Sequence, residues 1–252
     1  MKKRTVETLE TKILDSEAPF AIREAFNLLR TNLMYSIADG AEQAPVFAVT
    51  SSSEGTGKST VITNLAISFT QLGQKVLLID ADMRCPVLHE YFGIEDTNLG
   101  LSELISGIAK DVIVKDIIPN LDIITSGRIP PNPSELITSN RFAAFLDTWK
   151  KEYDVIFVDF PPIGIVTDSI ANSKAITGYI FTVRSGKSTA KKINTSIEAM
   201  ERIGAKILGV VLNDYDIKGT HHYGHYYNSH TKYYESAQKI AAKAAKETAE
   251  NE

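Results

Sequence analysis

The sequence predicts an α/β fold in which a mostly parallel β-sheet carries helices on both faces. Short apolar runs alternate with longer stretches of helical spacing along the 252 residues. The runs are apolar throughout, which is typical of strands buried on both faces. A glycine-rich segment also joins the first run of the core to a helical stretch. We expect right-handed crossovers between the strands.

The first predicted elements lie before the core. Residues 1–17 mix charged and polar side chains and are expected to form a mobile arm. Residues 18–37 have apolar side chains at helical spacing, and Asp39-Gly40 ends that pattern. One domain is expected over 18–214, without an internal repeat, followed by a flexible tyrosine-rich tail over 215–252.

The core is expected to contain alternating strands and helices. The predicted strands are the apolar runs Val46–Thr50, Val76–Ile79, Leu121–Thr125, Val155–Val158, Tyr179–Val183 and Ile207–Leu212. The predicted helices are Lys58–Leu72, Leu101–Ser106, Asn140–Lys151 and Thr189–Ile203.

Composition and charge restrict the classes of partner and compartment. The net charge of −4 gives no electrostatic case for nucleic acid. The single Cys85 excludes an intrachain disulfide and suits a reducing compartment. The basic N-terminus lacks the apolar stretch of a signal peptide, and no run approaches the roughly 18 apolar residues of a membrane span. We therefore expect a cytoplasmic protein.

The segment Ser52–Ser59 has the layout of a phosphate-binding P-loop. Its glycines allow backbone N–H groups to turn toward an anion, and the following helix adds its positive end. Lys58 is expected to be an exposed cation that reaches the β- and γ-phosphates, and Ser59 to hold Mg²⁺. The nucleotide contacts are expected from Ser53, Glu54, Gly55, Thr56, Gly57, Lys58, Ser59 and Thr60. Ser52 replaces the usual first glycine, but the flanking strand and helix argue against a chance turn.

Two further predicted strands end in aspartate. Asp80 and Asp82 follow one of them, and Asp159 ends the other. Such aspartates lie at the carboxyl edge of a parallel sheet, beside the P-loop. A single one is usually a helix cap or a turn residue, but two after one P-loop favour a site. Asp159 fits the Walker B role of holding Mg²⁺ mostly through water.

The segment Asp80-Ala81-Asp82 adds a carboxylate pair that an ordinary P-loop ATPase does not need. In an extended chain the two side chains project to the same side. Either carboxylate can bind the metal or accept a proton from an attacking hydroxyl, and the sequence leaves that choice open. Arg84 pairs with phosphate or carboxylate on one interpretation, and forms a surface salt bridge on the other.

These motifs resemble those of the bacterial tyrosine kinases, P-loop enzymes that control capsule and exopolysaccharide production. The resemblance covers roughly residues 18–234. The resemblance rests on the Walker A segment Ser52–Ser59, the Walker A-prime segment Leu77–Arg84 with Pro86, the Walker B segment Val155–Pro162, and the tyrosine cluster.

The resemblance implies an ATP- and Mg²⁺-dependent protein-tyrosine kinase that phosphorylates its own tail in trans. The implied catalytic residues are Lys58, Asp80, Asp82 and Arg84. The implied metal ligands are Ser59, Asp80, Asp82 and Asp159. The implied partners are a separate transmembrane adaptor, which recruits the cytoplasmic chain to the inner face of the plasma membrane, a cognate tyrosine phosphatase, and further copies in a ring.

The alternative is a partitioning or division-site type of switch ATPase without kinase activity. That branch carries an extra lysine in K-G-G-x-x-G-K-[ST]. The aligned position is Ser52, and no lysine lies between Val46 and Gly57. A tyrosine-rich tail also has no role in such a switch.

The tail holds the expected phosphoacceptors, which are Tyr223, Tyr226, Tyr227, Tyr233 and Tyr234. Alone, such a cluster also fits an aromatic tail that self-associates. The P-loop and the A-prime segment favour acceptors. Tyr215, close to the last strand, is expected to be structural, and the neighbouring histidines to be solvated rather than metal ligands.

The ring contact of the family reads E-x-x-R-x-x-R. The matching residues are Glu24, Asn27 and Arg30, with Asn27 in place of the middle arginine. We expect a ring interface that is weaker or that uses a different set of salt bridges. The alternative is that these charges form the wet face of an amphipathic helix.

Overall fold

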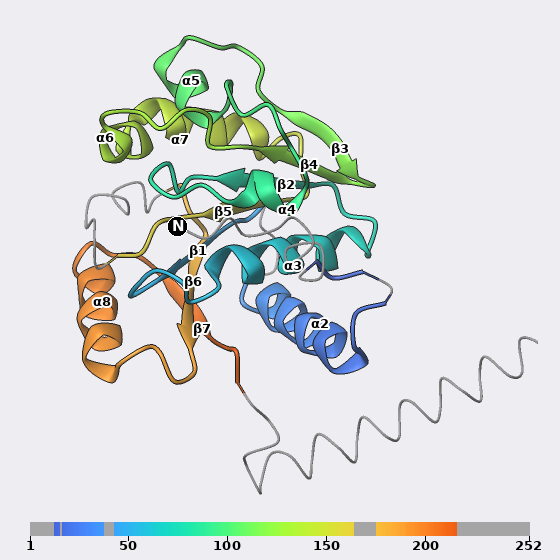
Figure 1. The fold of residues 1–252 in the computed structure, drawn as a ribbon, viewed down its shortest axis with the longest axis vertical. Helices are drawn as coiled ribbons and strands as arrows, with labels where there is room; N and C mark the ends of the chain where they lie inside the picture. Colours follow the sequence, from blue (N-terminus) through green and yellow to red (C-terminus); the bar gives the residue numbers. More distant parts are fainter. Residues whose placement is uncertain (1–12, 16, 38–42, 164–174, 216–252) are drawn as a thin grey trace, which may run out of the picture.

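The computed structural model describes residues 13–15, 17–37, 43–163 and 175–215, which form a seven-stranded sheet with helices on both faces (Figure 1). The strand order is β3-β4-β2-β5-β1-β6-β7. All pairings are parallel except β3 with β4, which is antiparallel. The strands are β1 (Val46–Ser51), β2 (Val76–Asp80), β3 (Val114–Ile118), β4 (Leu121–Ile124), β5 (Val155–Asp159), β6 (Gly178–Arg184) and β7 (Ile207–Asn213).

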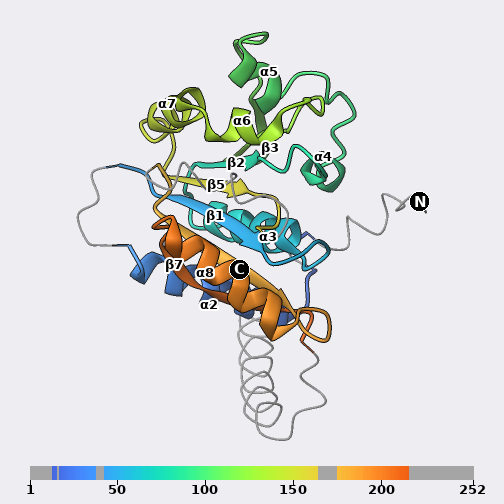
Figure 2. The same cartoon turned by 90° about the vertical axis from the view of Figure 1, so that its left-hand side faces the viewer.

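The helices divide between the two faces of the sheet. Those described are α2 (Phe20–Tyr35), α3 (Lys58–Thr70), α4 (Leu88–Tyr91), α5 (Leu101–Ser106), α6 (Pro133–Thr138), α7 (Asn140–Trp149) and α8 (Ala190–Arg202). Helices α2, α3 and α4 bury side chains in one apolar cluster, and α5 to α8 bury theirs in the other. Figures 1 and 2 show α2 and α3 packed side by side, with α8 beside the strand pair β6 and β7.

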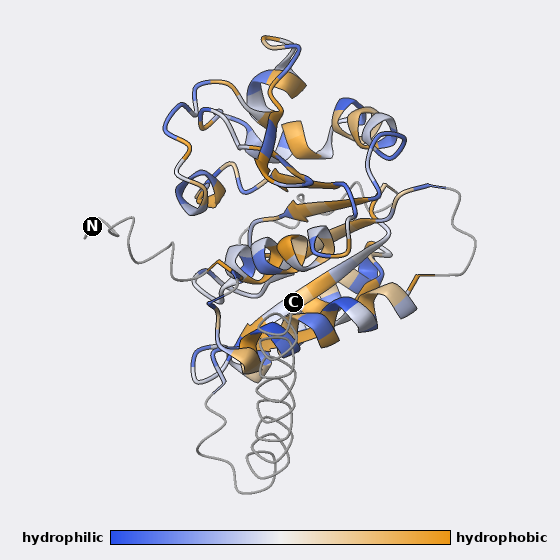
Figure 3. Cartoon of the chain, turned by 90° about the vertical axis from the view of Figure 1, so that its right-hand side faces the viewer, coloured by the Kyte–Doolittle hydropathy of each residue, from blue (hydrophilic) through white to orange (hydrophobic). Residues whose placement is uncertain are grey.

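The alternation of side chains along β1 shows why the predicted strands are apolar throughout. Val46 and Ala48 point into the cluster under α5 to α8, whereas Phe47 and Val49 point into the cluster under α2 and α3. All four are completely buried. Successive side chains of a strand face opposite sides, so a strand covered on both sides needs apolar residues at every position. Figure 3 shows the apolar colouring concentrated along the central strands.

The six predicted core strands are confirmed, whereas three short elements were not predicted. Strand β3 has only half-buried or exposed residues, and Asp116 within it has a φ of 48°. A β-bulge also shifts its register against β4. Helix α4 has only four residues, too few to show helical periodicity, and α6 begins at Pro133 within a proline-rich stretch that is typical of a loop.

The described residues of the segment before α2 are 13–15 and 17–19. Leu14 is 3% exposed, and its backbone N–H donates to Asn64 Oδ1 on α3 at 2.7 Å. This part of the expected arm therefore packs on the domain. The apolar stripe of α2 does the same through Phe26, Leu29 and Leu33, although Ile22 is 47% exposed.

Parallel pairing brings the candidate residues to one edge of the sheet. In the register between β2 and β5, Asp80 lies directly opposite Asp159. Strand β1 pairs with β5 on one side and with β6 on the other. The P-loop therefore starts between the strands that end in Asp159 and Arg184.

Candidate functional site

The P-loop joins β1 to α3 through two glycines in left-handed conformations. Gly55 has a φ of 67°, and Gly57, which caps α3, has a φ of 89°. A Cβ added to Gly57 would lie 2.0 Å from the Asn213 side-chain amide. Both the backbone conformation and the space exclude a side chain there. The start of α3 lies where the sequence predicts an anion site, and its backbone N–H groups are the kind of donor that such a site uses.

Lys58 is buried, contrary to the expectation of an exposed cation. Its exposed fraction is 7%, and its Nζ lies 3.7 Å from Asp82 Oδ2. Helix α3 begins at Lys58 and packs on β1, β2 and β5, which places this first side chain over the carboxyl edge. Lys58 therefore connects the P-loop with Asp82 of the A-prime segment.

Asp159 is completely buried at the end of β5. Its Oδ2 accepts a hydrogen bond from Ser59 Oγ at 2.5 Å. Its Oδ1 has no hydrogen-bond partner among the described residues. Burial raises the pKa of Asp159 to about 6, and the Lys58 ammonium opposes that shift. A buried carboxylate oxygen without a partner, beside a hydroxyl, fits a hard cation such as Mg²⁺.

Asp80 is also completely buried, but the following loop occupies both of its oxygens. Oδ1 accepts the backbone N–H of Asp82 at 3.2 Å. Oδ2 accepts the N–H groups of Val87 and Leu88 at 3.2 and 3.1 Å. Burial, together with the neighbouring Asp159, raises the pKa of Asp80 well above its ordinary value. The Asp80 carboxyl group therefore organises the loop that carries Asp82.

Asp82 has one oxygen directed at the cation of the site. Oδ1 accepts the backbone N–H of Cys85 at 3.2 Å, and Oδ2 faces Lys58. Burial raises the pKa of Asp82, and the Lys58 ammonium opposes the shift. The two aspartates of the A-prime segment thus have different environments, which their spacing in the sequence did not distinguish.

Within the described part of the chain, no three His, Cys, Asp or Glu side chains converge closely enough to hold a metal ion. Mg²⁺ usually keeps several waters and takes only one or two carboxylates beside the phosphates of its substrate. Ser59 and Asp159 supply donors of that kind, with Asp80 and Asp82 near them.

Among the described residues, the Arg84 guanidinium forms no ion pair with a carboxylate, although its backbone N–H lies against Asp82. Its guanidinium donates to Ser134 Oγ on α6 at 3.3 Å. The other predicted contact residues stay together on the P-loop, where Glu54 is exposed. Thr60 on α3 shares a hydrogen bond of 2.6 Å with the hydroxyl of Tyr91.

Three polar residues at the ends of β6 and β7 hold the P-loop and were not predicted. Arg184 Nη1 donates to the Gly55 carbonyl at 3.0 Å, and Lys187 Nζ approaches the same oxygen at 3.4 Å. Asn213 Nδ2 donates to the Thr56 carbonyl at 3.0 Å. Arg184 also pairs with Asp214 at 2.7 Å. The available signal was that Asn213-Asp214 ends a strand at the same edge as Asp80 and Asp159.

The remaining predicted residues lie on α2 or in the tail. The Asn27 amide donates to Glu24 Oε1 at 2.9 Å, and the Arg30 guanidinium donates to the Ser68 carbonyl at the end of α3. The expected acceptors Tyr223, Tyr226, Tyr227, Tyr233 and Tyr234 lie outside the described residues. Within the described ranges, no helix combines the length and the apolar character needed to cross a membrane.

Comparisons with known proteins agree with this geometry. The model of the CobQ/CobB/MinD/ParA nucleotide binding domain matches residues 47–241. A tyrosine-protein kinase CpsD of Streptococcus agalactiae is 37% identical over 80% of this chain and 87% of its own length.

Solved structures separate the two branches that the sequence left open. The chimerical protein CapA2B2 has a TM-score of 0.72 and 36% identity, and the match covers 82% of this chain and 98% of the chimera. The septum site-determining protein MinD of Pyrococcus horikoshii, in complex with Mg-ADP, has a TM-score of 0.58 and 25% identity, covering 68% of this chain and 71% of its own. The chain belongs to the bacterial tyrosine kinases within this P-loop family.

Proposed function

We propose that this chain transfers the γ-phosphoryl group of ATP to tyrosine hydroxyls, with its own tail among the acceptors. The observation that carries the proposal is the buried contact between Lys58 and Asp82 beside the Ser59–Asp159 hydrogen bond. It supports the proposal because it brings one cation and one carboxylate together beside the Walker B aspartate at the carboxyl edge of the sheet. The relatives named tyrosine-protein kinase support the same chemistry. One relative is named as a putative tyrosine-protein kinase in the cps region, which agrees with the role in capsule or exopolysaccharide production that the family resemblance implies.

In the proposed mechanism, the P-loop amides and Lys58 bind the β- and γ-phosphates. Ser59 and Asp159 are the residues that would hold Mg²⁺, and the ion would supply positive charge to neutralise the phosphates. The buried position of Lys58 strengthens its interaction with charge that develops during transfer, because little water screens it. Asp80 keeps the A-prime loop in place through its three backbone hydrogen bonds.

Asp82 is the proposed acceptor of the tyrosine proton. Its Oδ2 is the oxygen of the A-prime pair that faces the phosphate-binding lysine, whereas both oxygens of Asp80 accept backbone N–H groups. Lys58 opposes the effect of burial on the pKa of Asp82 and so favours the ionised form that a base requires. A contact between Arg84 and a phosphate requires the guanidinium to leave Ser134 when the substrate binds.

Transfer between subunits is tested by mixing two proteins that cannot phosphorylate themselves. One carries Lys58→Met with an intact tail, and the other has a working P-loop with Tyr223, Tyr226, Tyr227, Tyr233 and Tyr234 changed to Phe. Phosphate on the Lys58→Met chain supports transfer in trans. If the wild type is labelled and the mixture is not, transfer occurs within one chain.

The same incubation separates a kinase from a switch ATPase. A switch ATPase would release phosphate from MgATP and leave the tyrosines unmodified, whereas the kinase leaves phosphotyrosine on the protein. Mapping the modified residues by mass spectrometry therefore tests the proposed function directly. Ser52 at the position of the switch lysine favours the kinase outcome.

The proposed partners follow from the family. They are a transmembrane adaptor that recruits the cytoplasmic chain to the membrane, a tyrosine phosphatase that resets the tail, and further copies in a ring. Glu24 accepts a hydrogen bond from Asn27, and Arg30 donates one to the Ser68 carbonyl. Both of these charged side chains therefore already have partners within the chain, which weakens their contribution to a ring contact. A ring built through this helix is accordingly proposed to be weaker than one with three free charged residues.

A further inference from the structure

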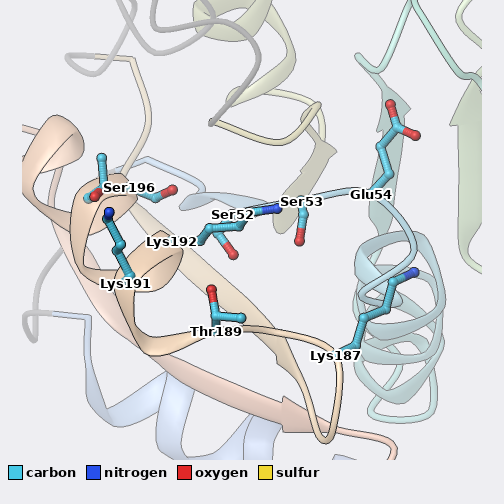
Figure 4. Close-up of a pocket in the computed structure, with 9 residues that line it drawn as sticks. Ser52, Ser53, Glu54, Lys187, Thr189, Lys191, Lys192 and Ser196 are labelled. Atoms are coloured by element: carbon cyan, nitrogen blue, oxygen red, sulfur yellow. The ribbon is translucent and has the colours of Figure 1, made fainter.

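A pocket of about 940 Å³ opens between the start of the P-loop and the first turns of α8 (Figure 4). Ser52 and Glu54 belong to its P-loop wall. Lys187, Lys191 and Lys192 belong to the opposite wall, more than 130 residues later in the chain. The proposed mechanism uses neither Lys191 nor Lys192.

The pocket is positively charged although the chain is acidic. Three lysines and one glutamate give its lining a net charge of +2, whereas the whole chain carries −4. Figure 4 shows the Glu54 carboxylate directed away from Lys191 and Thr189. Among the residues that the structure describes, Lys191 and Lys192 form no ion pair. The charge of this wall is therefore available to an anionic ligand.

Two uncharged groups of the pocket also favour an anion. Ser52 is 5% exposed, and its hydroxyl has no hydrogen-bond partner within the described residues. Figure 4 shows this hydroxyl pointing toward Thr189. Thr189 precedes α8, and its side chain makes no capping bond to the helix. A buried hydroxyl without a partner and an uncapped helix start are both donors that an oxyanion satisfies.

We propose that this pocket binds the phosphotyrosyl side chain of a peptide that the enzyme has already modified, an inference that rests on the proposed kinase activity. A phosphotyrosine carries about 1.5 to 2 negative charges and three acceptor oxygens, which match the lysines and the hydroxyls. The volume accommodates the ring as well as the phosphate. A peptide held there lies beside the P-loop, so a second tyrosine of the same peptide stays close to the nucleotide.

The arrangement gives a reason for the clustering of tyrosines in the tail. Tyr226 and Tyr227 are adjacent, as are Tyr233 and Tyr234. The first transfer creates the group that the pocket retains, and retention raises the local concentration of the remaining acceptors. Successive transfers to one tail then follow from one docking event.

Binding is tested with a fluorescent synthetic peptide of residues 220–234 that carries phosphate on Tyr227. The full chain is first dephosphorylated and saturated with MgADP, which fills the P-loop. Fluorescence anisotropy compares wild type, Lys191→Glu/Lys192→Glu, and the matched control Lys110→Glu/Lys151→Glu, whose lysines are exposed and lie outside the pocket. We expect affinity to fall at least about tenfold in the pocket variant and to stay at the wild-type value in the control.

Three outcomes would overturn the proposal. They are equal affinity of the two double variants, equal affinity of the wild type for phosphorylated and unphosphorylated peptide, and loss of binding when vesicles with anionic lipid compete but not when phenyl phosphate competes. The last outcome would assign the lysines to a membrane surface. A synthetic phosphopeptide needs no catalysis, so the result can be interpreted even if the chain transfers no phosphoryl group.

Discussion

The centre of the sheet and its β7 margin contribute to the same site in different ways. Every residue of β1, β2 and β5 is buried. In β7, by contrast, Val210 and Leu212 are 56% and 51% exposed. The central strands supply carboxylates whose pKa values burial raises, whereas the margin supplies polar side chains that hydrogen bond to P-loop carbonyls.

This difference suggests that the centre of the sheet and its β7 margin have different roles in the site. The buried side chains at the centre of the sheet interact with the charge of the nucleotide and its metal, and their low exposure to water strengthens each of these electrostatic interactions. Groups at the margin keep the loop in the conformation that presents its N–H groups. A change in the centre should therefore affect chemistry or pH dependence, and a change at the margin should affect nucleotide affinity by a smaller factor.

The largest effect is expected from Lys58→Met. Loss of the buried cation should lower the rate of phosphoryl transfer by about 10²–10³-fold, because its charge acts on the phosphates where water is excluded. Far-ultraviolet circular dichroism should remain that of the wild type, since methionine fits the start of a helix. Autophosphorylation close to the wild-type rate in the folded variant would refute the assignment of Lys58.

The next effect distinguishes the two A-prime aspartates. Asp82→Asn should lower kcat by about 10²-fold with little change in the KM for ATP, because it removes the proposed base. Asp80→Ala should instead lower the free energy of unfolding by about 1–3 kcal/mol, because Val87 and Leu88 lose their acceptor. If both variants changed only nucleotide affinity, the pair would be demoted to metal ligands.

An effect of similar size concerns how the free energy of unfolding depends on pH in the absence of metal. The pKa of Asp159 is raised from 3.8 to about 6, so the folded protein binds the proton more tightly than the unfolded chain. The stabilisation is complete below the unfolded pKa and is lost as pH rises through the folded pKa, a total of about 3 kcal/mol. Denaturant unfolding from pH 4 to 8 in EDTA should show this loss in the wild type. Asp159→Asn should lose less stability over this range, because only the raised pKa values of Asp80 and Asp82 remain, and identical profiles of the two proteins would contradict the assignment.

The smallest effect is expected at the margin. Asn213→Ala removes the hydrogen bond to the Thr56 carbonyl, which corresponds to about 1 kcal/mol, or roughly fivefold in affinity for MgATP. Leu212→Ala, an exposed neighbour on the same strand, is the control and should bind MgATP like the wild type. An effect of Asn213→Ala as large as that of Lys58→Met would remove the distinction between centre and margin.

The sequence predicted the central part of the molecule better than its margin. Continuous apolar runs identify β1, β2 and β5, and the residues that end them identify the site, because the carboxyl ends of parallel strands meet at one edge. Strand β3 has half-buried or exposed residues, and a β-bulge shifts its register against β4. Its polar and apolar residues therefore do not alternate regularly enough to predict a strand.

The contacts of the site were less predictable than its residues. The burial of Lys58 depends on how α3 packs against the sheet, and the different hydrogen bonds of Asp80 and Asp82 depend on the course of the loop up to Leu88. The contacts from Arg184 and Asn213 to the P-loop join residues more than 125 positions apart. Local patterns carry no information about such long-range contacts.

The position of Asn213 and Asp214 has a practical consequence for shortening or tagging the protein. A chain cut after Asp214 keeps the amide that bonds to Thr56 and the carboxylate that pairs with Arg184. A chain cut only two residues earlier, after Leu212, loses both and releases one side of the nucleotide loop. A tag or fusion partner for crystallography or screening should therefore begin beyond Asp214, even where the tyrosine-rich tail is removed.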